Sequence, residues 1–140
     1  MGATHKKLEI DGENKFEGRG VSYCAVCDGY FFKDKTVAVI GGGNTAVTEA
    51  TYLSHICKRV FLIHRGGALK ADRVLVQKLE KSGNVKILYN TNVVKIDGDE
   101  KVKSVTLDNE KILKTDGVFV AVGLEPRTEC VKGFVKTDDN

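Results

Sequence analysis

The stretch Thr36-Val37-Ala38-Val39-Ile40-Gly41-Gly42-Gly43-Asn44-Thr45-Ala46 decides how this chain folds. Its first five residues form a continuous, largely β-branched apolar run, which is typical of a strand buried on both faces of a parallel sheet. Three glycines follow, and then Asn44 and Thr45, whose polar side chains suit the start of a helix. The stretch therefore predicts a buried strand, a tight turn and a helix in immediate succession.

The next residues continue this alternation of strand and helix. Residues 44–56 have helical spacing. The apolar side of this helix consists of Ala46, Val47, Ala50 and Leu53. Residues 59–64 contain a second apolar strand, so residues 36–64 make one strand–helix–strand unit of about thirty residues.

Further along the chain the pattern changes. Residues 71–81 predict another helix, with Val74, Leu75 and Leu79 toward the core, and residues 85–89 predict a third strand. Three short strands joined by polar turns follow and predict an antiparallel meander. They lie at 93–96, 102–107 and 111–113, before a last buried strand at 117–122. We predict an α/β fold: a Rossmann-like nucleotide-binding domain whose central parallel sheet carries helices, plus the three-stranded β-meander.

The glycine turn has the spacing of a dinucleotide-binding fingerprint, Gly41-x-Gly43-x-x-Ala46. The first glycine makes the tight turn, the second lets the backbone approach a pyrophosphate, and the third position must be small for the helix to pack on the strand. The phosphates would then lie on the free N–H groups at the helix start. The alternative is a glycine-rich turn that only closes a strand–helix corner.

The end of the second strand distinguishes the two nicotinamide cofactors. NAD sites usually place an acidic residue there, whereas NADP sites place an arginine. Here His64 and Arg65 occupy the position, and Arg65 can pair with a 2′-phosphate, so NADPH is favoured. The predicted cofactor-binding residues are Gly41, Gly42, Gly43, Asn44, Thr45, Ala46, His64, Arg65, Lys70 and Arg73.

A dithiol motif, Cys24-Ala25-Val26-Cys27, lies just upstream. Its two sulfurs are close enough in sequence to form a small-loop disulfide, and the adjacent Asp28 could carry the proton that dithiol chemistry releases and takes up. Zinc binding is an alternative, but it needs four ligands, and the remaining cysteines and histidines stand singly. We predict no metal site, and we expect Cys57 and Cys130 to be small buried or half-buried thiols.

The bulk composition excludes several other classes. The 140 residues carry a formal charge of only +3, which is spread evenly and does not indicate nucleic-acid binding. The apolar runs are strand-sized, and the N-terminal residues lack the apolar core of a signal peptide. We therefore expect no membrane association and a cytoplasmic location.

Four stretches together resemble the bacterial-type, low-molecular-weight thioredoxin reductases, which are flavoproteins and pyridine nucleotide-disulfide oxidoreductases. The stretches are residues 20–29 with Phe31-Phe32, 39–46, 62–65 and 117–126. In that family an NADPH domain is inserted into an FAD domain. The resemblance implies a linker from the FAD domain at 1–8, the NADPH-binding and dithiol domain at 9–128, and the start of the return segment at 129–140. No second glycine fingerprint lies upstream, so we expect no FAD site within these residues.

The resemblance also implies roles for the matched residues. Cys24 would attack the disulfide of the protein substrate, Cys27 would face the flavin, and Asp28 would be the acid/base. Electrons would pass from NADPH to FAD, then to the Cys24–Cys27 disulfide and then to thioredoxin or a similar disulfide protein. The full-length enzyme would be a homodimer, and the fragment alone would be inactive.

The sequence departs from the family pattern at the cofactor-selecting segment. NADPH-specific members carry His-Arg-Arg and a further arginine, whereas this chain has Gly66 and Lys70 at the last two of these positions. This departure motivates an alternative, a flavin-linked disulfide reductase fed by another donor such as ferredoxin. A further alternative is a non-catalytic nucleotide-binding module whose Cys-x-x-Cys pair holds zinc.

Overall fold

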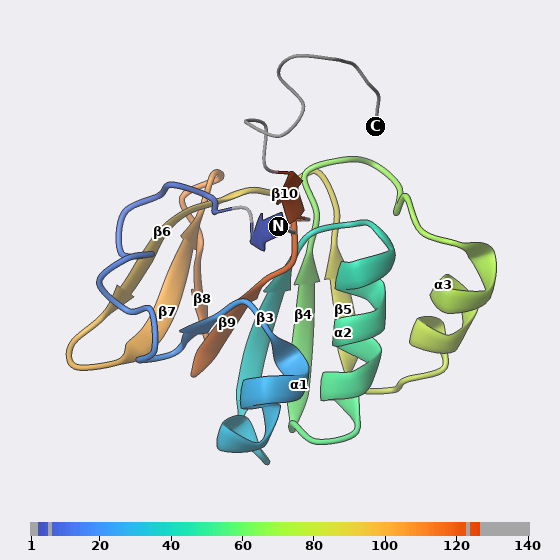
Figure 1. Cartoon of the computed structure of the whole chain (residues 1–140), viewed down its shortest axis with the longest axis horizontal. Coiled ribbons are helices and arrows are strands. Elements are labelled where there is room, and N and C mark those ends of the chain that lie inside the picture. The colour runs from blue at the N-terminus through green and yellow to red at the C-terminus, as the bar shows by residue number, and fades with distance from the viewer. Residues whose placement is uncertain (1–2, 6, 123, 127–140) are drawn as a thin grey trace.

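The centre of the fold is a five-stranded sheet in which every neighbouring pair of strands is parallel. The computed structural model describes residues 3–5, 7–122 and 124–126. In spatial order the strands are β2 (Val21–Ser22), β9 (Gly117–Val120), β3 (Thr36–Ile40), β4 (Arg59–Ile63) and β5 (Val85–Leu88). The predicted central strand is thus confirmed, with β9 on one side and β4 on the other (Figure 1).

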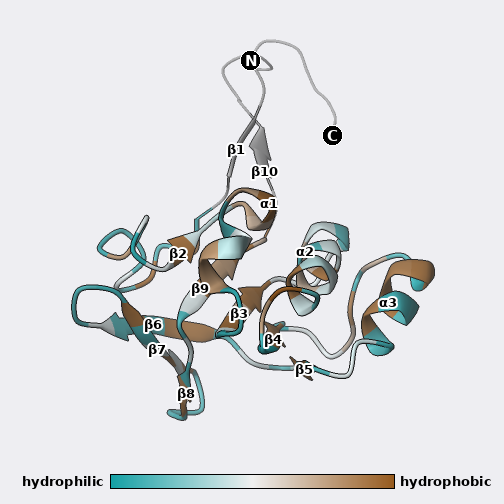
Figure 2. Cartoon of the chain, turned by 90° about the horizontal axis from the view of Figure 1, so that it is seen from below, coloured by the Kyte–Doolittle hydropathy of each residue, from teal (hydrophilic) through white to brown (hydrophobic). Residues whose placement is uncertain are grey.

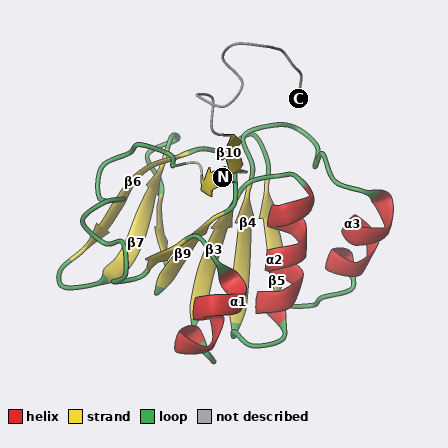
Figure 3. Ribbon diagram, viewed as in Figure 1, coloured by secondary structure: helices red, strands yellow, loops and turns green. Residues whose placement is uncertain are grey.

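Helices cover one face of this sheet (Figure 3). They are α1 (Ala25–Asp28), the short 3₁₀ helix η1 (Gly29–Phe32), α2 (Asn44–Ser54) and α3 (Arg73–Glu80). Alternate strand residues such as Val39 and Leu62 pack against Ala50 and Leu53 of α2. The side-chain period of two along a strand sends the other half of each apolar run to the opposite face.

The antiparallel meander covers that opposite face. It consists of β6 (Val93–Gly98), β7 (Val102–Leu107) and β8 (Ile112–Lys114). Ala38 and Ile63 from the parallel sheet share a second core with Ile96 and Val105 of the meander. Figure 2 shows the brown, apolar β3 and β4 between the helices and the meander. Because the helices cover one face of the sheet and the meander covers the other, both sides of the central strands β3 and β9 are buried. These strands are therefore continuous apolar runs rather than alternating ones.

The two ends of the described chain meet. Strand β1 (Ala3–His5) pairs antiparallel with β10 (Leu124–Pro126), so Ala3 lies opposite Pro126. The predicted linker at 1–8 therefore includes a paired strand. The proposed return segment at 129–140 and Cys130 lie outside the described residues, and the division into three segments stays a prediction.

Several sequence expectations need correction. The helix predicted at 71–81 begins only at Arg73, and Val74 is exposed rather than in the core. At about 100° per residue, Val74 points well away from the side of the helix that carries Leu75 and the buried Leu79. The short elements β2 and α1 were not predicted, because two and four residues are too few to show a period.

Candidate functional site

The glycine loop after β3 lies where the carboxyl ends of β3 and β9 meet. Gly41 has φ of +147°, and a Cβ there would overlap the carbonyl oxygen of Ala121. The same Cβ would lie 2.9 Å from the Cβ of Ala46. These two crowded contacts explain the fingerprint. The turn requires glycine at position 41, and the close approach of α2 requires a small residue at position 46.

Gly42 and Gly43 have different surroundings. A Cβ on Gly42 would overlap the imidazole ring of His64, which is buried. A Cβ on Gly43 would meet nothing within 4 Å, and its φ of −94° suits any residue. Packing therefore requires glycine at 42, whereas the space at Gly43 is open for a ligand to approach the backbone.

The start of α2 differs from the prediction. Gly43, not Asn44 or Thr45, is the N-cap, and no side chain caps the helix. Instead the Asn44 carboxamide oxygen accepts from the backbone N–H of Asp72 at 2.8 Å. The first-turn N–H groups of α2 thus lack a side-chain acceptor, and with the helix dipole they favour an anion such as a phosphate.

A pocket of about 410 Å³ opens at this helix start. It is lined by Lys7, Leu8, Ile40, Gly41, Gly42, Gly43, Asn44, Thr45, His64, Arg65, Asn92, Ala121 and Val122. It lies at the carboxyl ends of β3 and β9, where the strand order reverses, which is the usual ligand position in an open parallel sheet. The structure thus brings together seven of the ten predicted cofactor residues.

The other three lie outside the lining. Ala46 is buried beneath the loop, while Lys70 and Arg73 have exposed side chains. The backbone N–H of Lys70 donates to Gly42 O at 2.7 Å, so Lys70 contacts the glycine loop through its main chain. Ala121 and Val122 are the last two residues of the strand predicted at 117–122 and follow the observed β9, so that pattern could have located them. Lys7 and Asn92 carry no local signal in the sequence.

His64 and Arg65, the two residues after β4, have different positions relative to the pocket. The His64 ring lies under Gly42 and its Nε2 is 3.0 Å from the Ala68 carbonyl oxygen, so it supports the loop from below. Arg65 is exposed on the pocket wall. Of the predicted cations, Arg65 is therefore the one whose position suits contact with a charged group in the pocket.

Cys24 and Cys27 are joined by a disulfide, with their Cα atoms 5.3 Å apart. Cys24 is the N-cap of α1, and its Sγ accepts from the backbone N–H of Cys27 at 3.2 Å. Cys24 is half-buried and Cys27 is exposed. The motif follows β2, whose Ser22 pairs with Phe119 of β9, and leads into α1, whose Ala25 shares the buried cluster of α2, so the disulfide lies on the helix-covered side of the sheet.

Ser22 is a functional position that the sequence reasoning missed. Its hydroxyl donates to a carboxylate oxygen of Asp28 at 2.6 Å and accepts from the backbone N–H of Cys24 at 3.1 Å. One buried side chain thus holds both the predicted acid/base and the first cysteine. Three apolar side chains on this surface are exposed: Val26, Tyr30 and Phe31.

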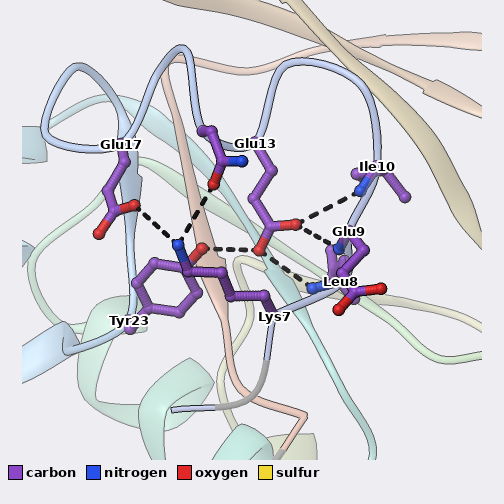
Figure 4. Close-up of polar contacts among 8 residues, drawn as sticks. Lys7, Leu8, Glu9, Ile10, Glu13, Glu17 and Tyr23 are labelled. Carbon is purple, nitrogen blue, oxygen red and sulfur yellow. Dashed lines mark hydrogen bonds and ion pairs between the residues drawn. The ribbon is translucent and has the colours of Figure 1, made fainter. Parts of the chain in front are cut away.

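A buried carboxylate anchors the segment before β2 (Figure 4). Glu13 is 1% exposed and accepts from the backbone N–H groups of Leu8, Glu9 and Ile10 and from the Tyr23 hydroxyl at 2.6 Å. Burial and the adjacent Glu13 raise the pKa of Tyr23 well above its usual value, so its hydroxyl stays a donor. The pocket-lining segment at 7–8 is thereby tied to the residue that precedes Cys24.

Among the described residues, Cys57 is a free and buried cysteine. Burial raises the pKa of the Cys57 thiol to about 11, which agrees with the inert role expected of it. Within residues 3–5, 7–122 and 124–126, no three His, Cys, Asp or Glu side chains are grouped to hold a metal ion. None of the helices in the described part of the chain has the length and apolar character needed to cross a bilayer.

The fold, the pocket and the disulfide define a class of domain, a Rossmann-type nucleotide-binding domain that carries a disulfide. Residues 1–140 match the sequence profile of the pyridine nucleotide-disulphide oxidoreductases, and the chain belongs to that family. Among its relatives it is similar to thioredoxin reductases. It is 44% identical to that of Listeria innocua over 144 residues and 43% identical to that of Borreliella burgdorferi over 145 residues.

Solved structures agree with this comparison. The thioredoxin reductase of Lactococcus lactis matches with a TM-score of 0.89 and 39% identity, over 99% of this chain. A ferredoxin-flavin thioredoxin reductase from Clostridium acetobutylicum matches with a TM-score of 0.70 and 32% identity, over 96% of this chain. The chain spans less than half of each: 45% of the Listeria innocua protein, 44% of the Borreliella burgdorferi protein, 48% of the Lactococcus lactis chain and 44% of the Clostridium acetobutylicum chain.

Proposed function

We propose that this chain is the NADPH-binding and redox-dithiol domain of a thioredoxin reductase. The observation that carries the proposal is that one parallel sheet carries both a redox-type disulfide, directly after β2, and a dinucleotide-type pocket, directly after β3. The name shared by the relatives at about 40% identity over nearly the whole chain supports the substrate class.

The residues present fit a pyridine nucleotide. The uncapped start of α2 offers N–H groups to the pyrophosphate, and the open space at Gly43 admits it. When bound, NADPH would supply the electron pair that FAD of the full-length protein passes to the Cys24–Cys27 disulfide. FAD itself is expected to bind outside these residues.

The dithiol would then reduce its protein substrate by exchange. Cys24 first gives up its thiol proton, and its thiolate attacks one sulfur of the substrate disulfide and displaces the other as a thiolate. Cys27 next loses its proton and attacks Cys24 Sγ, which re-forms the Cys24–Cys27 bond and releases the second substrate thiolate. Asp28, which lies on the same short helix and accepts from Ser22, would carry a proton in this step. The substrate gains two electrons and two protons, and the domain loses them.

The choice of NADPH rests on Arg65. A guanidinium on the pocket wall can make charge-assisted hydrogen bonds with a 2′-phosphate, each worth roughly 1.5–3 kcal/mol. Gly66 and Lys70 replace two further family arginines, so the preference depends on fewer contacts. Thioredoxin as partner, a homodimer in the full-length protein and a cytoplasmic location belong to this same proposal.

Besides the departure at Gly66 and Lys70, the match to the Clostridium acetobutylicum structure favours the ferredoxin-type alternative. The match to the Lactococcus lactis structure has both a higher TM-score and a higher identity. The complete glycine loop also favours the nucleotide reading, because nothing in the packing requires glycine at Gly43.

The test is to substitute each cysteine of the dithiol in the full-length protein. Cys24→Ser or Cys27→Ser should abolish thioredoxin reduction and leave flavin reduction by NADPH intact. Thioredoxin reduction that survives either substitution would overturn the role of the dithiol. Flavin reduction by reduced ferredoxin but not by NADPH would support the alternative.

A further inference from the structure

Glu49 carries a carboxyl group that has no role in the reaction above, and it lies close to α1, the helix that begins directly after Cys24. Glu49 is on α2, three residues after Ala46 and four before Leu53. Both of those residues share a buried cluster with Ala25, the first residue of α1. This spacing places Glu49 on the side of α2 that faces α1.

The contacts of Glu49 join it to the start of α1. Burial raises the pKa of Glu49 to about 7, although hydrogen bonding from the backbone N–H of Ala25 acts in the opposite direction. Its Oε1 is buried and has no hydrogen-bond partner among the described residues. A half-satisfied carboxyl that titrates near neutral pH is costly to keep and is often functional.

The dithiol adjoins Ala25, the residue of α1 that Glu49 contacts. Ala25 follows Cys24 directly, and the Cys24 sulfur accepts from the same short helix whose first N–H binds Glu49. A negative charge on Glu49 therefore opposes a thiolate on Cys24, and a thiolate on Cys24 favours the protonated form of Glu49.

Other titratable groups around α2 have different partners or positions. Asp28 on α1 is bound by Ser22, and Cys27 is exposed. The remaining ones are Tyr30 on η1, Tyr52 and His55 on or beside α2, Arg73, Lys78 and Glu80 on α3, Arg59 on β4 and Lys86 on β5. Burial, not a charged neighbour, accounts for the rise in the pKa of Glu49.

We infer that Glu49 is a positioning residue for the dithiol, whose carboxyl group takes up a proton when Cys24 is a thiolate and releases it when the disulfide re-forms. This inference rests on the proposed redox role of Cys24 and Cys27. Reduction by a dihydroflavin or an external dithiol breaks the S–S bond and adds two electrons and two protons. Cys24 then ionises while Glu49 is protonated. As the disulfide returns, the proton from Glu49 and the proton from Cys27 balance the two thiolates released by the substrate.

The test is the pH profile of Cys24 alkylation in the reduced 140-residue chain. The rate with iodoacetamide is followed at the Cys24 peptide by mass spectrometry from pH 5 to 10. In the wild type, the profile should show an inflection near pH 7 in addition to that of the thiol. In Glu49→Gln, which keeps an acceptor for Ala25, the inflection near pH 7 should be lost, and the rate at pH 8 should rise about threefold or more. Glu80→Gln, an exposed carboxyl on α3, should match the wild type.

Superimposable profiles for folded Glu49→Gln and wild type would overturn the inference. If Glu49→Gln fails to fold, infrared difference spectra of the wild type decide: reduction near pH 7 must increase the protonated-carboxyl band, and no change overturns the inference. Neither readout needs nucleotide, flavin or thioredoxin. Failure of the thioredoxin reductase proposal would show separately, in the thioredoxin reduction assay of Cys24→Ser and Cys27→Ser described above.

Discussion

Gly41 and Gly43 stand two residues apart in one loop, yet the structure requires only the first to be glycine. Gly41 has a positive φ and no room for a Cβ next to Ala121, whereas the position of a Cβ on Gly43 is empty. A side chain at Gly43 would therefore disturb a ligand and not the fold.

Gly43→Ala should fold with nearly wild-type stability and bind NADPH at least tenfold more weakly, because the methyl group occupies the space in which the pyrophosphate meets the backbone. Calorimetric titration measures the affinity, and thermal unfolding measures the stability. The matched control is Gly83→Ala, a glycine outside the pocket with equally open surroundings, which should bind normally. Equal affinities for both variants would contradict this account of the loop.

Glu49 also predicts a pH dependence of stability. Its pKa is raised from about 4.5 to about 7 in the folded chain, so its contribution to stability is full below pH 4.5 and is lost as the pH rises through 7. Glu49→Gln has no titratable group at this position, so it does not lose stability in this way as the pH rises. From pH 5 to pH 8, its stability relative to wild type should rise by roughly 1–2 kcal/mol, after allowance for solvent screening of a partly exposed group. Denaturant unfolding of the two oxidised chains at pH 5 and pH 8 measures the difference in their free energies of unfolding. A difference that does not change with pH would contradict this prediction.

At the scale of elements, the long apolar runs are the part that the sequence predicted well. β3, α2 and β4 lie within one or two residues of their predicted positions, because each is long enough to show its period and each buries that period in a core. The short elements depend on contacts far along the chain. β2 has two residues and exists because it pairs with β9, almost a hundred residues later.

The segment before β2 depends on one buried side chain, which no periodicity indicates. Glu13→Ala would remove the carboxylate that accepts from three backbone N–H groups and from the Tyr23 hydroxyl, and it should cost about 2–4 kcal/mol. Denaturant unfolding measures the loss. The control is Glu17→Ala, whose exposed pair with Lys7 at 3.3 Å should be worth less than about 1 kcal/mol. Similar losses for the two variants would show that the buried network does not hold this segment.

At the scale of the whole molecule, the sequence located both chemical motifs but not their surroundings. The fingerprint and the dithiol are local patterns, so Gly41, Gly43, Cys24 and Cys27 could be named in advance. Lys7 and Asn92 line the pocket only because the fold brings distant segments together. Glu49 lies within the predicted helix, but its position beside α1 follows from a helix that the sequence did not predict.

The whole arrangement, a disulfide and a nucleotide pocket on one parallel sheet, has its most direct test in cofactor binding. The 140-residue chain should be titrated with NADPH and with NADH in parallel by calorimetry. The account predicts that NADPH binds, and at least tenfold more tightly than NADH, because Arg65 pairs with the 2′-phosphate. Binding of neither nucleotide to the folded chain would contradict it, and equal binding of the two would contradict the role of Arg65.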